Sequence, residues 1–331
     1  MSSIITAAKE FRADVLRNDK AILRQLSSAY EQIFKSLNRQ FRELQRDIEQ
    51  AQRAGNTITQ DWLRRSYRYQ SLIRQVKAEI AEFSFNTSRL IQSKQADAIR
   101  LGQSHAADLI MTALPELTFA RLPTGAIEEM VGVLANGSPL NKVLDRLAGD
   151  AAQQIRETLI TGLGSGHGVA KIASGIRDAI DVPRWKALQI ARTETLRAYR
   201  QSTLATYAEN EDVLSGWIWI SALSTRTCVA CWALHGTFFP LSKQFFPAHV
   251  SCRCTSIPSI KGEKTNVRSG SVAFANLEPD QQQTILGPSR YEMYASGTSL
   301  DDFVILTRDK DWGGAYQVRP LHRMKDRRIA A

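Results

Sequence analysis

CVACWALHGTFFPLSKQFFPAHVSCRC, residues 228–254, contains all four cysteines of the 331-residue chain. It also holds two of the five histidines, although it is a small part of the sequence. Disulfides are rare in a reducing compartment, so cysteines gathered in this way indicate metal ligands or redox groups. The stretch therefore predicts a small module built around a metal ion.

The spacing within this stretch is typical of a structural zinc site. Cys228 and Cys231 form a CxxC pair, and His249 and Cys252 form an HxxC pair, with Cys254 close behind. Zinc prefers four nitrogen and sulfur ligands in a tetrahedron, supplied in pairs from tight turns. We expect one Zn²⁺ held by Cys228, Cys231, His249 and either Cys252 or Cys254. The HxxC spacing favours Cys252, and the choice between the two stays open.

Other chemistry can be read from the same residues. A redox CxxC of the thioredoxin type lies between a strand and a helix and does not need further ligands behind it. A cysteine nucleophile conflicts with thiolates occupied by a metal. A zinc-knuckle nuclease of the HNH kind needs a second histidine or an asparagine in a triplet with His235 or His249, and no such residue stands where the triplet would close. We keep this nuclease as the alternative function and interpret His235 as a loop residue.

The sequence before the cysteines predicts a helix followed by a strand. IARTETLRAYRQ, residues 190–201, lies in a helical pattern, with Arg192 and Glu194 near its middle. These two residues are two positions apart, so they cannot pair on one helix face and need partners elsewhere. GWIWISAL, residues 216–223, alternates bulky side chains as a strand does. The glycines of residues 161–180 lack the GKS or GKT of a phosphate-binding loop, which favours a simple corner between helices.

The N-terminal third predicts two long helices. Residues 20–50 carry apolar side chains at helical spacing, and a second stripe lies between residues 57 and 101. Ala54-Gly55-Asn56 provides the turn between them, and the spacing of Thr57 and Gln60 predicts a capping box at the start of the second helix. The two helices should form an antiparallel hairpin with apolar surface left over. That surface would either dock on a partner or pack on residues 101–200 as one bundle.

The fold class that we predict is mainly α, with a long N-terminal helical hairpin and a small α+β module stapled by zinc. The predicted divisions are a hairpin arm at residues 1–114, a helical middle at 115–210, a β-containing zinc module at 211–305 and a basic tail at 306–331.

Charge points to an anionic partner. The net charge is +10, and residues 1–100 carry 18 Lys and Arg against 11 Asp and Glu. We expect weak binding to double-stranded DNA without sequence preference, through this region and the tail. The candidate tail residues are Arg319, Arg323, Lys325, Arg327 and Arg328. The sequence carries no recognisable signal peptide and no apolar run long enough to cross a membrane, so we expect no membrane association and a cytoplasmic site of assembly.

Taken in order, these motifs resemble those of the phage head morphogenesis family of Mu F-like minor head proteins. The resemblance is carried by IARTETLRAYRQ, the tryptophan strand, TRTCVACWALHGTFFP, FPAHVSCRC and the later ILGPSRYEMYASGTSLDDFV. It extends from about residue 159 to residue 304. The resemblance implies that Arg192 and Glu194 fix the core beside the zinc knuckle.

The same resemblance implies a structural rather than enzymatic function. Members of the family are minor components of the virion head that act in head assembly or DNA packaging. They associate with the portal protein, with other head proteins and with packaged DNA, in several copies around the portal vertex. Localisation to the virion is therefore expected after assembly in the host cytoplasm.

Overall fold

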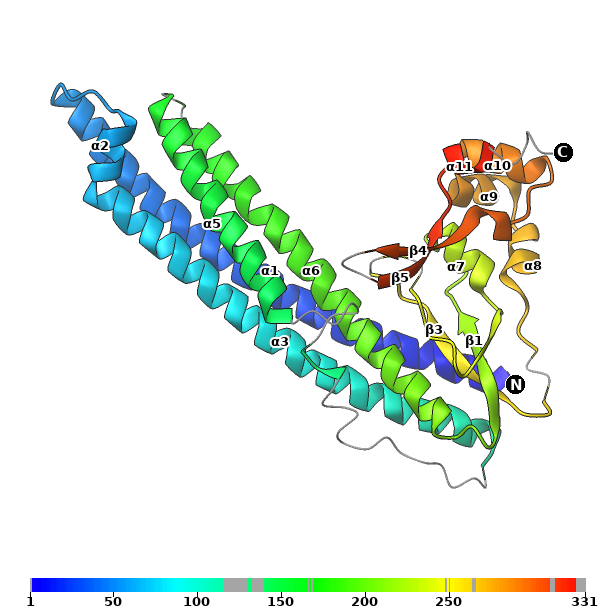
Figure 1. Ribbon diagram of the computed structural model, residues 1–331. Helices are drawn as coiled ribbons and strands as arrows, with labels where there is room; N and C mark the ends of the chain where they lie inside the picture. The colour runs from blue at the N-terminus through cyan, green and yellow to red at the C-terminus, as the bar shows by residue number, and fades with distance from the viewer. Residues whose placement is uncertain are drawn as a thin grey trace. The chain divides into compact units, whose positions relative to one another are not determined.

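The computed structural model describes residues 2–115, 130–132, 140–165, 167, 169–247, 249, 251–263, 266–309 and 313–325 (Figure 1). The long helices are α1 (Ser2–Arg53), α3 (Tyr67–Ala113), α5 (Leu140–Gly164) and α6 (Val169–Ala208). The short ones are α2 (Gln60–Arg65), α7 (Val229–Leu234), α8 (Gly270–Ala275), α9 (Pro279–Leu286), α10 (Pro288–Ala295), the 3₁₀ turn η1 (Asp301–Phe303) and α11 (His322–Lys325). The strands are β1 (Leu214–Ile220), β2 (Phe238–Pro240), β3 (Thr255–Ile260), β4 (Val304–Asp309) and β5 (Gly313–Val318). The prediction of a mainly α protein with a small sheet region is confirmed.

Two compact units divide the chain. The sheet unit comprises residues 1–18, 94–131 and 193–331, and the bundle unit comprises residues 19–93 and 132–192. Helices α1, α3 and α6 each contribute residues to both units. The units therefore follow three-dimensional contacts, whereas the divisions predicted at residues 114, 210 and 305 follow sequence order.

The bundle unit is built on the predicted apolar stripes. On α1 the buried stripe is Ile22, Leu26, Tyr30, Leu37, Phe41, Leu44 and Ile48. On α3 the stripe buries Leu72, Val76 and Ile80, and Phe83 is half-buried. The spacing of three and four residues places these side chains on one face of each helix, which is why the two helices were predictable.

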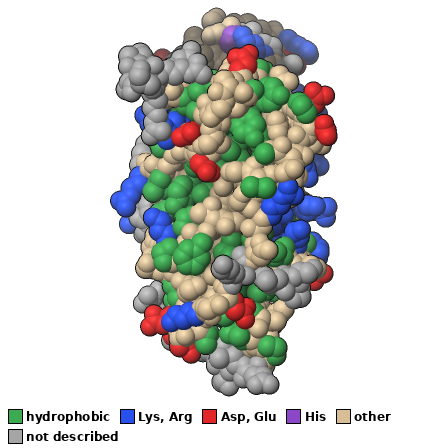
Figure 2. Space-filling view, turned by 90° about the vertical axis from the view of Figure 1, so that its right-hand side faces the viewer, with side chains coloured by type: hydrophobic (Ala, Val, Ile, Leu, Met, Phe, Trp, Pro, Cys, Tyr) green, Lys and Arg blue, Asp and Glu red, His purple; other side chains and the backbone are tan. Residues whose placement is uncertain are grey.

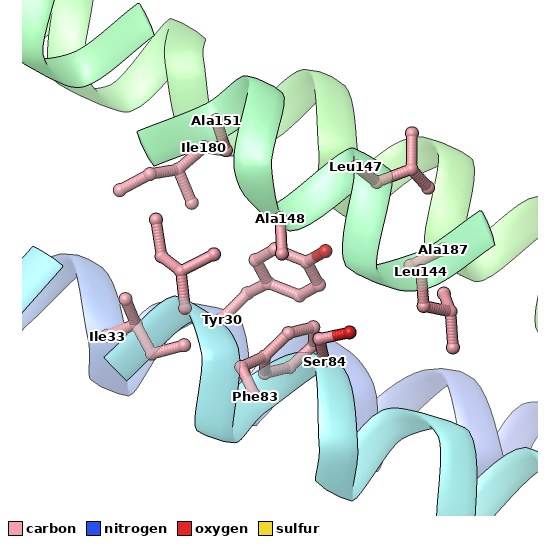
Figure 3. Close-up of a pocket in the computed structure, with 11 residues that line it drawn as sticks. Tyr30, Ile33, Phe83, Ser84, Leu144, Leu147, Ala148, Ala151, Ile180 and Ala187 are labelled. Carbon is pink, nitrogen blue, oxygen red and sulfur yellow. The ribbon is translucent and has the colours of Figure 1, made fainter. Parts of the chain in front are cut away.

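Helices α5 and α6 cover the remaining apolar surface of this pair. Tyr30 of α1 and Phe83 of α3 point toward Leu144 and Ala148 of α5 and Ile180 of α6 (Figure 3). They enclose a largely apolar cavity of about 20 Å³, which is large enough for roughly one water molecule and no larger ligand. The sequence left open whether the hairpin docks on a partner or packs on residues 101–200. In the structure the hairpin packs on α5 and α6 as half of a four-helix bundle.

The turn after α1 differs from the prediction in its capping. Gly55 has a φ of +83°, which suits a glycine, so the break at residues 54–56 is confirmed. Thr59, not Thr57, caps the next helix, and its hydroxyl accepts a hydrogen bond from the Trp62 amide at 3.1 Å. The predicted capping box is therefore wrong. Helix α2 then stops at Ser66, whose ψ of 123° is extended, before α3 begins.

The sheet unit contains a three-stranded antiparallel sheet in the order β2-β1-β3. Alternation along β1 gives the sheet two apolar faces. Trp217 and Trp219 pack with residues of α3, α6 and the cysteine segment, while Ile218 and Ile220 pack with the start of α1. The predicted strand at residues 216–223 is thus confirmed at Leu214–Ile220, with both faces buried.

The C-terminal part of the sheet unit forms a second small core. Phe274 of α8 and Phe303 of η1 are fully buried and cluster with Trp232 of α7. The antiparallel hairpin of β4 and β5 packs against α7. Among the described residues, no helix combines the length and hydropathy needed to span a membrane.

Candidate metal centre

The first two cysteines are positioned by the short helix α7. Cys228 is its N-cap residue, and its sulfur accepts a hydrogen bond from the Cys231 amide at 3.4 Å. A cap residue and a residue three positions later lie on the same turn. The CxxC spacing therefore directs both Sγ atoms to one side of the helix start.

The remaining candidates come from the turn that leads into β3. The Cys252 amide donates to the His249 carbonyl at 3.1 Å, and Ser251 adopts a left-handed φ of +63°. Cys254 directly precedes β3. This turn brings the HxxC pair back to α7, although about twenty residues of chain separate the two halves.

All five predicted ligands gather around Cys231. The Cys231 Sγ lies 3.9 Å from the Cys252 Sγ and 4.0 Å from the His249 Nε2. Two groups meet at this residue: Cys228, Cys231 and His249, and Cys231, Cys252 and Cys254, with the ligand atoms within each group no more than 4.8 Å apart. Four sulfur ligands at 2.3 Å from a tetrahedral zinc ion would lie about 3.8 Å from one another.

The donor set therefore fits a metal ion. All four cysteines are free, and the 3.9 Å between the Cys231 and Cys252 sulfurs is well beyond the length of a disulfide bond. Cys231, Cys252 and Cys254 are buried against the tryptophan face of the sheet, whereas the His249 side chain is exposed. A bound ion would have a buried sulfur side and an imidazole at the solvent edge.

Protons are distributed unequally among the thiols. The hydrogen bond from Cys231 lowers the pKa of Cys228 to about 5 and lowers the pKa of Cys252 well below its usual value. Hydrogen bonds to Cys228 and Cys252 raise the pKa of Cys231. Two thiolates are thus already favoured, and a divalent cation would stabilise them while displacing the remaining thiol protons.

Helix α6 and the start of α1 hold the backbone of the second ligand turn. Arg200, which is 5% exposed, donates from Nε to the Cys254 carbonyl at 2.9 Å and from Nη2 to the Cys252 carbonyl. The Thr193 hydroxyl accepts from the Ser251 amide at 3.0 Å. Arg12 donates to the Arg253 carbonyl at 2.7 Å. Residues 251–254 are therefore bonded at every position, and such outer contacts orient metal ligands.

Sequence reasoning missed Arg200, Thr193 and Arg12. Thr193 and Arg200 are seven residues apart, so they lie on the same face of α6, and this spacing is a signal that could have paired them. The contribution of Arg12 could not have been found, because 241 residues separate it from Arg253.

The two residues singled out on α6 have partners of their own. Arg192 forms an ion pair with the buried Asp19 of α1, with Nε 2.8 Å and 3.0 Å from the two carboxylate oxygens. Glu194 is fully buried and accepts from Arg197 Nε at 2.5 Å. Thr193, which lies between them, is the residue of this motif that bonds to the ligand turn.

His235 is structural. Its Nδ1 accepts a hydrogen bond from the Ser221 amide at 2.9 Å, and the side chain is buried. Burial, assisted by the charge of Lys9, lowers the pKa of His235 to about 4, so the imidazole is neutral. Because Nδ1 already accepts a hydrogen bond from the backbone, it is not available as a general base. Of the two histidines considered for the nuclease, His235 is therefore unsuited to that role.

The predicted DNA-binding tail is placed only in part. Arg319 is half-buried and donates to the Val304 carbonyl at 3.3 Å, so it braces the β4–β5 hairpin. Arg323 is exposed. Lys325 ends α11, and Arg327 and Arg328 lie outside the described residues.

A comparison with protein families matches the segment that contains this centre. Residues 153–257 match the family described as Phage Mu protein F like protein. The predicted resemblance to Mu F-like proteins is confirmed for this segment, which includes all five candidate ligands together with Thr193 and Arg200. The match indicates the phage head morphogenesis class. It ends before the distal part of the predicted resemblance, residues 258–304.

Among curated proteins, the chain is similar to the NAD(+)--arginine ADP-ribosyltransferase EFV of Enterococcus faecalis (strain ATCC 700802 / V583). The two are 26% identical over 159 residues, which is 43% of this chain. The chain spans 33% of that protein's length, so the similarity concerns a minor part of it. No solved structure matches the chain.

Proposed function

We propose that this protein is a minor head protein of a tailed phage, in which a zinc-stapled module supports a structural role in head assembly or DNA packaging. One observation carries the proposal. The segment that matches Mu F-like proteins contains all five candidate metal ligands and two of the side chains that hold their backbone. The candidate centre therefore lies within the segment by which this chain resembles those proteins.

Zinc is the ion that suits these ligands best. Three cysteines and one histidine, or four cysteines, form a soft tetrahedral set, and thiolate ligands select against magnesium and calcium. With Cys231 central, Cys228 and His249 complete one side, and Cys252 or Cys254 the other. A site in which protein ligands fill all four positions holds a fold together and has no open position for substrate.

A structural role follows from this ligand set rather than an enzymatic one. Thiolates that fill a closed four-ligand site have no open position beside them for a substrate, and His235 is engaged with the backbone. The transferase activity in the name of the E. faecalis relative belongs to a protein three times as long as the shared region. We therefore carry neither that activity nor the nuclease alternative to this chain.

The partners proposed for this role are the portal protein, other head proteins and packaged DNA. Location in the virion follows from the same class, with several copies arranged around the portal vertex. Basic surface supports the DNA contact, since the chain has a net charge of +10.

Incorporation into heads tests this function. The full chain would be expressed with the portal and head proteins of its phage, and purified heads would be probed for it. We expect the chain in the heads, and its loss when Cys231→Ser removes the residue shared by both ligand groups. Ser242→Ala, at an exposed position between the ligand pairs, is the control. Heads that never contain the chain would refute the proposal.

DNA cleavage tests the alternative. Purified protein would be incubated with plasmid and Mg²⁺ or Mn²⁺, and we expect the plasmid to stay intact. Nicking that disappears in His249→Ala would establish the nuclease instead.

A further inference from the structure

The end of the bundle unit where α1 passes into α3 is an ordered structure. A two-residue turn would be enough to join two antiparallel helices, but here α2 is inserted between them (Figure 1). Thr59 caps α2, and the Ser66 amide donates to the carbonyls of Trp62 and Leu63 at its end. Leu63 is fully buried, and α2 packs against α5. The helix is therefore fixed at both ends and on its inner face.

This anchored helix presents arginines to solvent. Residues 53–74 contain Arg53, Arg64, Arg65, Arg68 and Arg74, while Asp61 is the only acidic residue. Arg68 is neutralised by Glu43 and Asp47, at 3.1 Å and 2.9 Å. The remaining four arginines are exposed, and Arg64 lies 3.9 Å from Asp61 in a pair open to water. Such an exposed pair contributes little, so most of the positive charge is available.

Two further observations extend this surface. Arg156 of α5 is exposed, and its charge joins that of Arg64 in opposing the burial that raises the pKa of Tyr69. Both guanidinium groups therefore lie near the start of α3. Tyr67 is 77% exposed, with Arg74 6.0 Å from its ring centre. Within the part of the chain that the structure describes, Arg53, Arg65, Arg74 and Arg156 form no ion pair.

We propose that this surface, named the bundle tip, binds the sugar–phosphate backbone of duplex DNA. The bundle tip consists of Arg53, Arg64, Arg65, Tyr67, Arg74 and Arg156. Guanidinium groups match phosphate oxygens in geometry and charge, and an exposed tyrosine hydroxyl adds a donor. The inference rests on the proposed function, because it assigns the DNA contact of a head protein to a particular surface.

Two features favour DNA over an acidic protein. A protein interface needs an apolar centre, and Tyr67 is the only large apolar side chain that the bundle tip exposes. The charges also lie on an ordered helix and its neighbours, as a contact to a regular phosphate array requires. Figure 2 shows one face of the molecule, on which basic, acidic and apolar side chains all occur and Lys and Arg gather at the right-hand edge.

The experiment compares two double variants of the full chain that lose the same charge. Arg64→Gln with Arg65→Gln changes the bundle tip, and Lys20→Gln with Arg24→Gln changes exposed basic residues of α1 that are far along the helix from Arg53. Binding to a labelled 30-base-pair duplex is measured by fluorescence anisotropy at several salt concentrations. Circular dichroism verifies that both variants are folded.

We expect the tip variant to bind about tenfold more weakly and to lower the slope of log affinity against log salt by about two, one for each phosphate that is no longer neutralised. The affinity of the control variant for the duplex should change by less than about twofold.

Equal effects of the two variants would overturn the assignment to the bundle tip, as would wild-type protein that does not bind DNA. In that last case, loss of the tip variant from heads would identify an acidic protein partner instead. Failure here is distinguishable from failure of the proposed function, because wild-type incorporation into heads is scored separately.

Discussion

The bundle unit and the sheet unit keep their folds by different means. The bundle buries regular stripes on four helices, and each apolar residue contributes a similar, local share of stability. The sheet unit arranges short elements around Trp217, Trp219 and a group of buried cysteines that could hold a metal ion. Periodic packing tolerates the loss of one member, whereas a coordination site is complete or absent. Substitutions in one unit should therefore have effects that differ in kind and size from substitutions in the other.

The largest effect should come from the metal. Cys231→Ser removes the residue shared by both ligand groups, and a structural zinc contributes on the order of 10 kcal/mol to such small sites. We expect the sheet unit to lose its tertiary structure while the helical signal of the bundle persists. Near-ultraviolet circular dichroism and elemental analysis would measure this, with Ser242→Ala as control. A variant with a native near-ultraviolet spectrum would contradict the zinc-dependent fold.

A cavity in the bundle should have a smaller effect. Leu37 is 1% exposed on α1, and truncating a buried leucine to alanine costs about 3 kcal/mol. We expect Leu37→Ala to lower the free energy of unfolding in urea without changing the zinc content. Lys35→Ala, at an exposed position on the same helix, is the matched control. If Leu37→Ala lost zinc in proportion to stability, the distinction between the units would fail.

Arg200→Lys tests the support of the ligand turn. Lysine keeps the charge but lacks the planar fork through which the guanidinium donates to the Cys252 and Cys254 carbonyls. We expect a loss of about 2 kcal/mol and about tenfold weaker zinc binding, measured by competition with a chelating dye. Arg146→Lys, at an exposed site in the bundle, should change neither quantity.

Acid should affect the sheet unit through its buried histidines. Burial lowers the pKa of His235 and of His105 to about 4. The unfolded chain therefore binds protons at higher pH than the folded one, so stability is complete above about pH 6.5 and falls as the pH drops toward 4. We expect about 1 kcal/mol for each histidine after allowance for solvent screening.

His235→Asn tests the contribution of His235 to the pH dependence of stability. The asparagine oxygen can accept from the Ser221 amide as Nδ1 does, but it does not titrate. Urea unfolding between pH 6.5 and pH 4, followed by tryptophan fluorescence, should give a shallower dependence on pH in the variant. An unchanged dependence would mean that His235 takes up its proton at the same pH in the folded and the unfolded chain.

Sequence was sufficient where short-range spacing decides structure. The stripe from Ile22 to Ile48, the glycine turn at Gly55 and the alternation around Trp217 are local patterns, and so are the CxxC and HxxC pairs. Their gathering around Cys231 is the arrangement that a shared metal ion would require. The number and identity of the bound ions do not follow from spacing alone.

Long-range partners were not predictable in the same way. Arg12 contacts Arg253 and Arg192 contacts Asp19, although each pair is far apart in the chain. The periodicity of a single sequence does not predict such long-range contacts. Thr59 was missed as a cap because Thr57 offers the same side chain two residues earlier. Arg319 looked like a free tail charge, since only tertiary structure brings it to the Val304 carbonyl.

The sharing of α1, α3 and α6 between the units has a consequence for dissection of the molecule. The chain crosses from one unit to the other four times, and three of the crossings lie inside continuous helices. A single protease cut in a loop therefore does not separate one unit from the other, and no terminal truncation isolates either one. Removing residues 1–100 would take Ile4 and Ala8 away from Ile218 and Ile220 as well as dismantling the bundle. To obtain one unit alone, α1, α3 and α6 would have to be cut within the helix and the remaining segments joined by linkers in their original order.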